Sequence, residues 1–160
     1  MTEPAFDSAR FRQVLGHFPT GVCIVSAFQG GTPVGMAIGS FFSVSLEPPL
    51  VGFCAGKTSS SWAKLRDLGQ FCVSVLADDQ EEVSRRFASK EADKFAGLAW
   101  DTSPLGSPRL GGALAWIDCR TSTISDGGDH EVVLGEVHDL AVAREGHPLI
   151  FFRGGYSHLA

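Results

Sequence analysis

The chain has 160 residues, of which 44% are hydrophobic and 19% are charged, and its formal net charge at pH 7 is −5. This length corresponds to one domain over residues 1–160, which can bury enough apolar surface to fold without disulfides or metals. The hydrophobic fraction excludes a disordered chain, and the acidic balance without a Lys/Arg block argues against a nucleic-acid partner. Between Gln13 and Gly56 the only formal charge is Glu47. Because Pro and Gly interrupt this block, we expect no membrane-spanning helix there but a buried segment.

The amino terminus and the cysteines indicate a cytoplasmic protein. The first ten residues contain acidic side chains and no apolar stretch of the kind found in secretory signals. The four cysteines are far apart without a C-x-x-C pair, and three of them lie in apolar, strand-like runs. We therefore expect buried free thiols and no metal site.

The predicted elements begin with a helix and continue as short strands. Asp7 can cap a helix whose apolar side chains fall on one stripe. This stripe consists of Phe11, Val14, Leu15 and Phe18. Strand-like runs follow at 21–28, 33–38, 50–55 and 70–76.

Two further helices are predicted between the strands. Ser59 or Ser60 can cap a short one, and Asp78 with Glu81 has the spacing of a capping box for the other. The remaining expected elements are a polar connection over 88–112, a hairpin with strands at 113–124 and 129–142 and a turn at 125–128, and a last strand at 148–153. So many short strands in one small domain predict a mainly β fold, an antiparallel barrel with short helical insertions.

Several motifs associated with catalysis are incomplete. The segment from Gly52 to Thr58 has three residues between its glycines, whereas a phosphate-binding loop has four. His130 and Glu131 begin a zinc-protease motif, but Leu134 stands where the second histidine belongs. Neither G-x-S-x-G nor G-x-G-x-x-G occurs, so a hydrolase elbow and a Rossmann dinucleotide site are also unsupported.

Three features allow both a binding role and a purely structural one. The uncharged stretch 35–45 places three serines among Met and Phe, which suits a planar ring with polar edges or a buried strand with structural serines. Residues 57–61 combine a lysine, four hydroxyls and a helix N-terminus, which suits an anion or a solvated cap loop. His130 follows a Gly-Gly turn, where it can contact a ligand or serve only the turn.

Taken together, these segments resemble one family. The matching stretches occur in family order and are Phe18–Val22, Gly35–Val51, Lys57 with Ser59–Ser61, Gln70–Leu76, Arg86-Phe87, Asp93–Gly97, Gly128–His130, and Pro148-Leu149 with Tyr156. On these residues the chain is identified as a member of the short-chain flavin reductases of the FMN-binding split-barrel superfamily, the reductase components of two-component flavin monooxygenases. The runs 45–51, 89–98 and 126–130 are most similar to reductases serving a hydroxylase of a phenolic intermediate in bacterial steroid-ring breakdown.

The resemblance implies a homodimer of six-stranded antiparallel split barrels of Greek-key type, with FMN or FAD at or near the subunit interface. It also implies hydride transfer from NADH or NADPH to the flavin, which then leaves in reduced form for a separate oxygenase. A flavin-binding split-barrel protein without reductase activity is the alternative, because the same scaffold also serves for binding alone.

The resemblance further implies roles for individual residues. His130 is expected to contact the nicotinamide and is the one candidate catalytic residue. The residues expected to bind cofactor are Gly35, Met36, Ala37, Ile38, Gly39, Ser40, Ser43, Ser45, Cys54, Ala55, Lys57, Ser59, Ser60, Arg86, Phe87, Lys94 and Tyr156. Of these, Lys57, Ser59 and Ser60 are expected to hold the phosphate end, and Arg86, Phe87 and Lys94 to close over it. Ala37 and Gly39 depart from the family pattern, so ring-edge hydrogen bonds would fall to backbone amides and Ser40.

Overall fold

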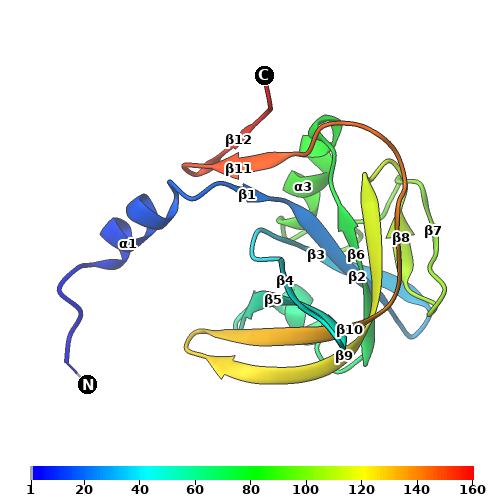
Figure 1. Cartoon of the computed structure of the whole chain (residues 1–160), viewed down its shortest axis with the longest axis horizontal. Helices are drawn as coiled ribbons and strands as arrows, with labels where there is room; N and C mark the ends of the chain where they lie inside the picture. Colours follow the sequence, from blue (N-terminus) through cyan, green and yellow to red (C-terminus); the bar gives the residue numbers. More distant parts are fainter. Residues whose placement is uncertain (1) are drawn as a thin grey trace.

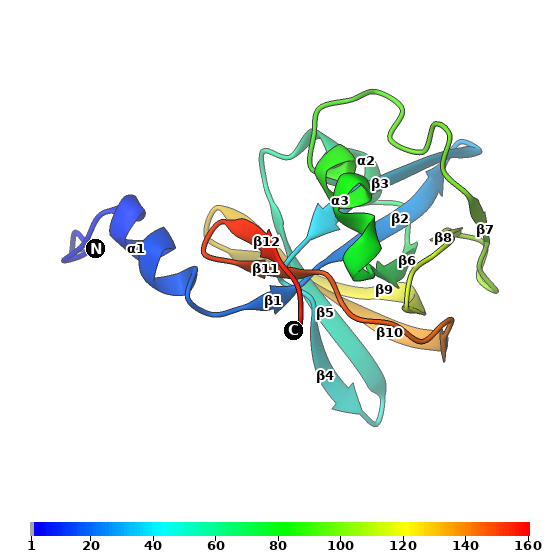
Figure 2. The ribbon, with the colours of Figure 1, turned by 90° about the horizontal axis from the view of Figure 1, so that it is seen from above.

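The computed structural model describes residues 2–160, which fold around one curved sheet (Figures 1 and 2). The helices are α1 (Ser8–Leu15), α2 (Ser60–Leu65), the 3-10 helix η1 (Asp78–Gln80) and α3 (Glu81–Phe87). The strands are β1 (Thr20–Gly21), β2 (Cys23–Gln29), β3 (Thr32–Ile38), β4 (Phe42–Leu46), β5 (Pro49–Gly56), β6 (Gln70–Val75), β7 (Trp100–Thr102), β8 (Pro108–Leu110), β9 (Ala115–Gly127), β10 (His130–Val142), β11 (Ile150–Phe152) and β12 (Gly155–Ser157). No helix within residues 2–160 has the length and apolar character needed to cross a membrane.

The main sheet contains seven strands in the order β3-β2-β6-β9-β10-β5-β4, and every neighbouring pair is antiparallel. The sheet curls so that β3 comes into contact with β5. Strands β1, β11 and β12 form a second, smaller sheet, and β7 pairs with β8. The mainly β, antiparallel fold is confirmed. The main sheet has one strand more than the six expected because β4 adds an edge strand.

The barrel interior is filled by side chains from alternate positions of the strands. Phe53 on β5 is fully buried, and its ring packs edge-to-face on Trp62 at 5.7 Å and on Phe71 at 5.3 Å. Edge-to-face aromatic pairs add about 0.5–1.5 kcal/mol to what burial alone contributes. This cluster joins α2 to β5 and β6, and it thereby fixes where α2 begins.

A second core lies on the outer face of β3, where α3 packs. The Phe87 ring at the end of α3 lies edge-to-face on Phe95 at 4.9 Å. A Cβ atom on Gly35 would lie 2.8 Å from the Phe87 ring and 3.0 Å from the backbone oxygen of Val25. Only glycine therefore allows α3 to pack so closely on β3.

All four cysteines are free thiols, as the sequence predicts. Cys23, Cys72 and Cys119 are buried and Cys54 is half-buried. Burial raises the pKa of Cys23 and of Cys119 to about 12, and it also raises the pKa of Cys72. These thiols pack as small hydrophobic side chains.

The first two helices begin where the sequence predicts. The Asp7 carboxylate accepts a hydrogen bond of 2.8 Å from the backbone N–H of Arg10. The Ser59 hydroxyl accepts one of 3.1 Å from the backbone N–H of Trp62. Each bond satisfies a donor that the first turn of a helix leaves unpaired.

The predicted capping box of Asp78 and Glu81 is wrong. A 3-10 turn occupies residues 78–80 before α3 begins at Glu81. The capping contact runs from Gln80, whose side-chain oxygen accepts a 2.9 Å hydrogen bond from the backbone N–H of Ala77. A glutamine three residues after an alanine is not a recognised capping pattern, because the alanine has no oxygen to return the bond.

The long hairpin is present, but its turn lies further along the chain than predicted. Gly127 pairs with His130, so the turn is Gly128-Asp129 and residues 125–127 continue β9. Gly128 has a φ of +80°, which glycine adopts without strain. Strand β12 and the β7–β8 pair inside the expected polar connection were not predicted either, because three-residue strands carry no alternation that a sequence pattern can detect.

The apolar stripe of α1 does not pack against the barrel of its own chain. Figures 1 and 2 show α1 projecting from the rest of the chain, and none of its residues is buried. Val14 is 60% exposed and Phe18, just beyond the helix, is 73% exposed. The lack of charge in this part of the block therefore does not serve the core of this chain.

Candidate functional site

The outer face of β3 and the residue after it consists of small residues. Met36 and Ile38 point into the barrel core, whereas Gly35, Ala37 and Gly39 are on the other face because side chains alternate. On the outer face, Met36 and Ile38 can therefore contact a ligand only through their backbone groups. Phe87 covers this face at Gly35, whereas at Ala37 and Gly39 the face offers a nearly bare backbone that a flat ligand can approach closely.

A cavity of about 190 Å³ opens on this face, and we call it the β3 cavity. It is lined by Val22, Ala37, Ile38, Gly39, Ser84, Ala88, Phe151 and Tyr156. The Tyr156 hydroxyl and the Ser84 hydroxyl are joined by a hydrogen bond of 2.6 Å. The Thr20 hydroxyl is buried without a partner among residues 2–160, 3.1 Å from where a Cβ of Gly39 would lie. An apolar surface next to an unpaired hydroxyl fits a planar ring with polar edges.

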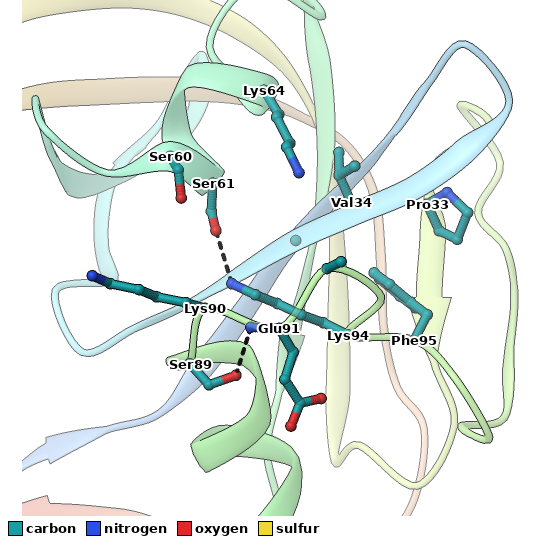
Figure 3. Close-up of a pocket in the computed structure, with 12 residues that line it drawn as sticks. Pro33, Val34, Ser60, Ser61, Lys64, Ser89, Lys90, Glu91, Lys94 and Phe95 are labelled. Carbon is teal, nitrogen blue, oxygen red and sulfur yellow. Dashed lines mark hydrogen bonds between the residues drawn. The ribbon is translucent and has the colours of Figure 1, made fainter.

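A second cavity, of about 90 Å³, lies between α2 and the segment that follows α3 (Figure 3). We call it the lysine cavity. Its polar lining residues are Ser60, Ser61, Lys64, Ser89, Lys90, Glu91 and Lys94, so three cations face one carboxylate. The size suits a phosphate group and excludes a fused ring system. Figure 3 shows the ammonium groups of Lys64 and Lys94 near Ser61, with the Lys90 ammonium directed away from them. Ammonium groups beside serine hydroxyls are the donors that a phosphate requires.

Lys94 is held in the lysine cavity by two hydrogen bonds. Its Nζ donates to the Ser61 hydroxyl at 2.8 Å, which Figure 3 shows, and to the Phe87 carbonyl at 2.9 Å. Burial lowers the pKa of Lys94 from its ordinary value, and the neighbouring charge of Lys64 lowers it further. A bound anion would oppose both effects, so the charges in this cavity favour an anionic ligand.

Three residues predicted near the phosphate have other tasks in the structure. The Lys57 ammonium pairs with the Asp126 carboxylate, and the Ser59 hydroxyl caps α2. Arg86 donates a 2.5 Å hydrogen bond to the carbonyl of Ala96 and so ties down the segment that carries Lys94. Of this predicted set, Ser60 and Lys94 are the residues that line the lysine cavity.

The Phe87 ring, which the resemblance predicts to close over the ligand, lies in the core of this chain. The residue is 1% exposed and belongs to the core formed with Phe95. An aromatic residue at the end of a helix has the same sequence pattern whether it covers a cofactor or a core. In this structure the Phe87 ring lies so close to Gly35 that nothing fits between the two residues, and the ring is therefore part of the core.

The serine-rich segment is only partly available to a ligand. The Ser40 hydroxyl donates to the Cys54 carbonyl at 3.1 Å and accepts from the Cys54 N–H at 2.9 Å, so it joins the β3–β4 loop to β5. Ser43 is exposed and Ser45 is half-buried on the edge strand β4. Ala55 lies in the barrel core, which leaves its backbone as the only group that can contact a ligand.

His130 lies at the start of β10, beside the hairpin turn, in a third cavity of about 620 Å³ that also contains Cys54. Its Nδ1 lies 2.7 Å from the Asp129 carboxylate. The pKa of Asp129 is lowered by this hydrogen bond, so the group is an ionised acceptor and Nδ1 carries the proton. The Nε2 atom is therefore free for a ligand, and the absence of a side chain at Gly56 leaves space next to it.

Glu131 links the hairpin to α2 and so fixes the helix that supplies the serines. Its carboxylate accepts hydrogen bonds from the Trp62 indole at 3.0 Å and from Arg66 at 2.9 Å. The Arg66 hydrogen bond, and then that of Trp62, lowers the pKa of Glu131. This ion pair is at the surface, so its role is to set an orientation rather than to supply much stability.

The anion site considered from the sequence at residues 57–61 includes Ser61, but sequence reasoning missed Lys64, Ser89 and Lys90 in the lysine cavity. Lys64 lies four residues after Ser60 in the same helix and so on the same face, a signal that the sequence does contain. Lys90 follows α3 in an irregular segment, where no periodicity indicates its direction.

The chain belongs to the family described as flavin reductase like domain, whose pattern its residues 15–160 match. The resemblance and the split-barrel fold predicted from the sequence are thus confirmed. It is 54% identical over 153 residues to the reductase subunit HsaB of a flavin-dependent monooxygenase from Rhodococcus jostii, a match covering 96% of this chain and 78% of that protein.

Solved structures agree with this membership. Nitrilotriacetate monooxygenase component B from Mycobacterium thermoresistibile superimposes with a TM-score of 0.93 at 49% identity, covering 96% of this chain and 87% of the other. The NADH:FAD oxidoreductase SgcE6 of Streptomyces globisporus, in complex with NAD and FAD fragments, superimposes with a TM-score of 0.90 at 38% identity. That match covers 99% of this chain and 98% of SgcE6.

Proposed function

We propose that this chain oxidises NADH or NADPH, reduces FMN or FAD, and supplies the reduced flavin to a separate oxygenase. The 54% identity to the reductase subunit of a flavin-dependent monooxygenase over nearly the whole chain carries this proposal. The β3 cavity and the lysine cavity support it, because together they offer a flat apolar face and a phosphate-sized cationic pocket.

In this proposal the lysine cavity holds the flavin phosphate and the small residues of β3 face the ring. His130 orients the nicotinamide through its free Nε2, since Nδ1 is bonded to Asp129. A bound flavin supplies the two-electron acceptor. The protein then contributes orientation and exclusion of water, which can account for a large part of the rate in such reactions.

The function is tested by mixing the purified protein with FMN or FAD under anaerobic conditions and following NADH and NADPH absorbance. We expect oxidation of at least one nucleotide that depends on added flavin. Flavin binding without turnover of either nucleotide would reject the proposal and support a binding protein instead.

The lysine cavity provides a second prediction. Replacing Lys64 by glutamine is expected to raise the dissociation constant of the flavin about fivefold, the upper end of what an exposed ion pair contributes. Flavin fluorescence titration measures this change. Arg120→Gln is the matched control, because it also removes one exposed positive charge but lies outside the cavity. Equal flavin dissociation constants for the two variants would show that the flavin phosphate does not bind in the lysine cavity.

We also propose that the protein is a cytoplasmic homodimer. Exposed apolar side chains support a second copy as the partner: Leu46 is 92% exposed, Val142 75% and Phe18 73%. Large exposed apolar surfaces on a folded protein mark interaction sites.

The cysteines support the cytoplasmic location. The four free thiols are typical of a reducing compartment.

The dimer is tested at Leu46. Sedimentation velocity of the wild-type chain should give a mass near twice 17.0 kDa, and Leu46→Lys should shift the population toward monomer by at least tenfold in dissociation constant, which corresponds to about 1.4 kcal/mol. A wild-type monomer at micromolar concentration would contradict the proposal.

A further inference from the structure

The segment before and within α1 forms one wall of the His130 cavity. Residues of both sides line this space: Pro4, Phe6, Asp7, Ser8, Phe11 and Arg12 from the amino-terminal segment, and Cys54, Gly127, Asp129 and His130 from the barrel. Its volume of about 620 Å³ lies in the range of ligand pockets, roughly 300–1,000 Å³. Figure 1 shows this segment on the same side of the molecule as the tip of the β9–β10 hairpin.

Two stacked aromatic rings contribute apolar surface to this wall. The rings of Phe6 and Phe11 are 6.1 Å apart and nearly parallel, with an interplanar angle of 20°. Both residues keep about half of their surface exposed, 47% and 51%. Rings of this kind, facing a cavity with a histidine on the other side, suit a planar heteroaromatic ligand.

The charges of the cavity leave one cation without a partner. The Asp7 carboxylate caps α1, and the Asp129 carboxylate is bonded to His130. Arg12 also lines the cavity, and within residues 2–160 its guanidinium makes no ion pair or side-chain hydrogen bond. A planar guanidinium is the preferred protein group for phosphate. The cavity therefore suits a ligand that combines a flat ring with a phosphate.

We propose that residues 4–12 form part of the nicotinamide-nucleotide site, in which Arg12 binds a phosphate of NADH or NADPH and the rings of Phe6 and Phe11 pack on a planar ring of the same molecule. This inference rests on the proposed function, which places the nicotinamide at His130. A flavin nucleotide also combines a ring with a phosphate. The lysine cavity already provides for the flavin phosphate, which leaves Arg12 for the second nucleotide.

The test is direct binding of NADH to the flavin-free protein by isothermal titration calorimetry. Arg12→Gln is expected to weaken NADH binding about fivefold, the upper end for an exposed ion pair. Phe11→Ala is expected to weaken it by a similar factor, because it removes an aromatic contact with the ring of the ligand. Arg10→Gln is the matched control, since it removes a neighbouring arginine of α1 that does not line the cavity.

A flavin titration of the same variants distinguishes the two ligands. Unchanged flavin dissociation constants, within twofold, support the assignment to the nicotinamide nucleotide. A loss of flavin affinity equal to the loss of NADH affinity would overturn it, and so would equal NADH binding by Arg12→Gln and Arg10→Gln. The proposed function fails separately, if the wild-type protein binds both nucleotides but does not oxidise NADH or NADPH in the presence of flavin.

Discussion

Replacing His130 by alanine is expected to lower kcat/KM for NADH about tenfold, while the dissociation constant of the flavin changes less than twofold. A tenfold change corresponds to about 1.4 kcal/mol of transition-state stabilisation. The reason is geometric: the bond from Nδ1 to Asp129 fixes the ring at the edge of its cavity and leaves Nε2 for the nicotinamide. Steady-state kinetics and a flavin titration measure the two quantities independently.

The control for this variant is His138→Ala. His138 lies on the same strand but lines a different surface pocket, away from His130. We expect its kinetics to match the wild-type protein. If His130→Ala loses flavin affinity and turnover to the same degree, the residue belongs to the flavin site and its assignment to the nicotinamide is wrong.

Replacing Phe87 by alanine is expected to lower the free energy of unfolding by about 3–5 kcal/mol, the usual cost of removing a buried phenylalanine. The ring fills the space between α3 and β3, and its loss leaves a cavity beside Gly35 and Phe95. Chemical denaturation at equilibrium measures the change. The space left by the Phe87 ring can be partly refilled only if α3 moves. The packing of α3 on β3 limits that movement, so most of the lost stability is not recovered.

The matched variant is Phe87→Leu, which keeps most of the buried volume. We expect it to recover more than half of the lost stability and to bind flavin as the wild-type protein does. A stable Phe87→Ala variant with a selective loss of flavin affinity would show that the ring contacts the ligand, as the sequence resemblance alone had suggested.

The sequence predicts best those elements whose pattern depends only on residues that are neighbours in the chain. Short apolar runs suffice to predict β2 and β5, and a capping residue suffices for α2, because these signals are local to each element. The direction in which α1 presents its apolar stripe is not local. The spacing of Phe11, Val14 and Leu15 predicts an apolar face, but it does not distinguish the core of the same chain from another surface.

The candidate site shows the same limit. Resemblance identified the segments that surround the cavities, and Ser60, Lys94 and His130 line those cavities, while their roles toward a ligand stay predictions. It could not tell Phe87, which is buried, from a residue that faces a ligand, because both lie in the same motif. Arg12 carries no sequence signal at all, since its relation to His130 arises only when the amino-terminal segment folds beside the hairpin.

The buried thiols have a consequence for a protein that would release reduced flavin. Reduced flavins generate peroxide when they meet oxygen, and peroxide attacks the thiolate form of cysteine. Burial raises the pKa of Cys23 and Cys119 to about 12, so these thiols are almost entirely protonated at pH 7. Together with Cys72 these groups lie in the core, where oxidation would require unfolding. The barrel thus resists the oxidants that its own product can form.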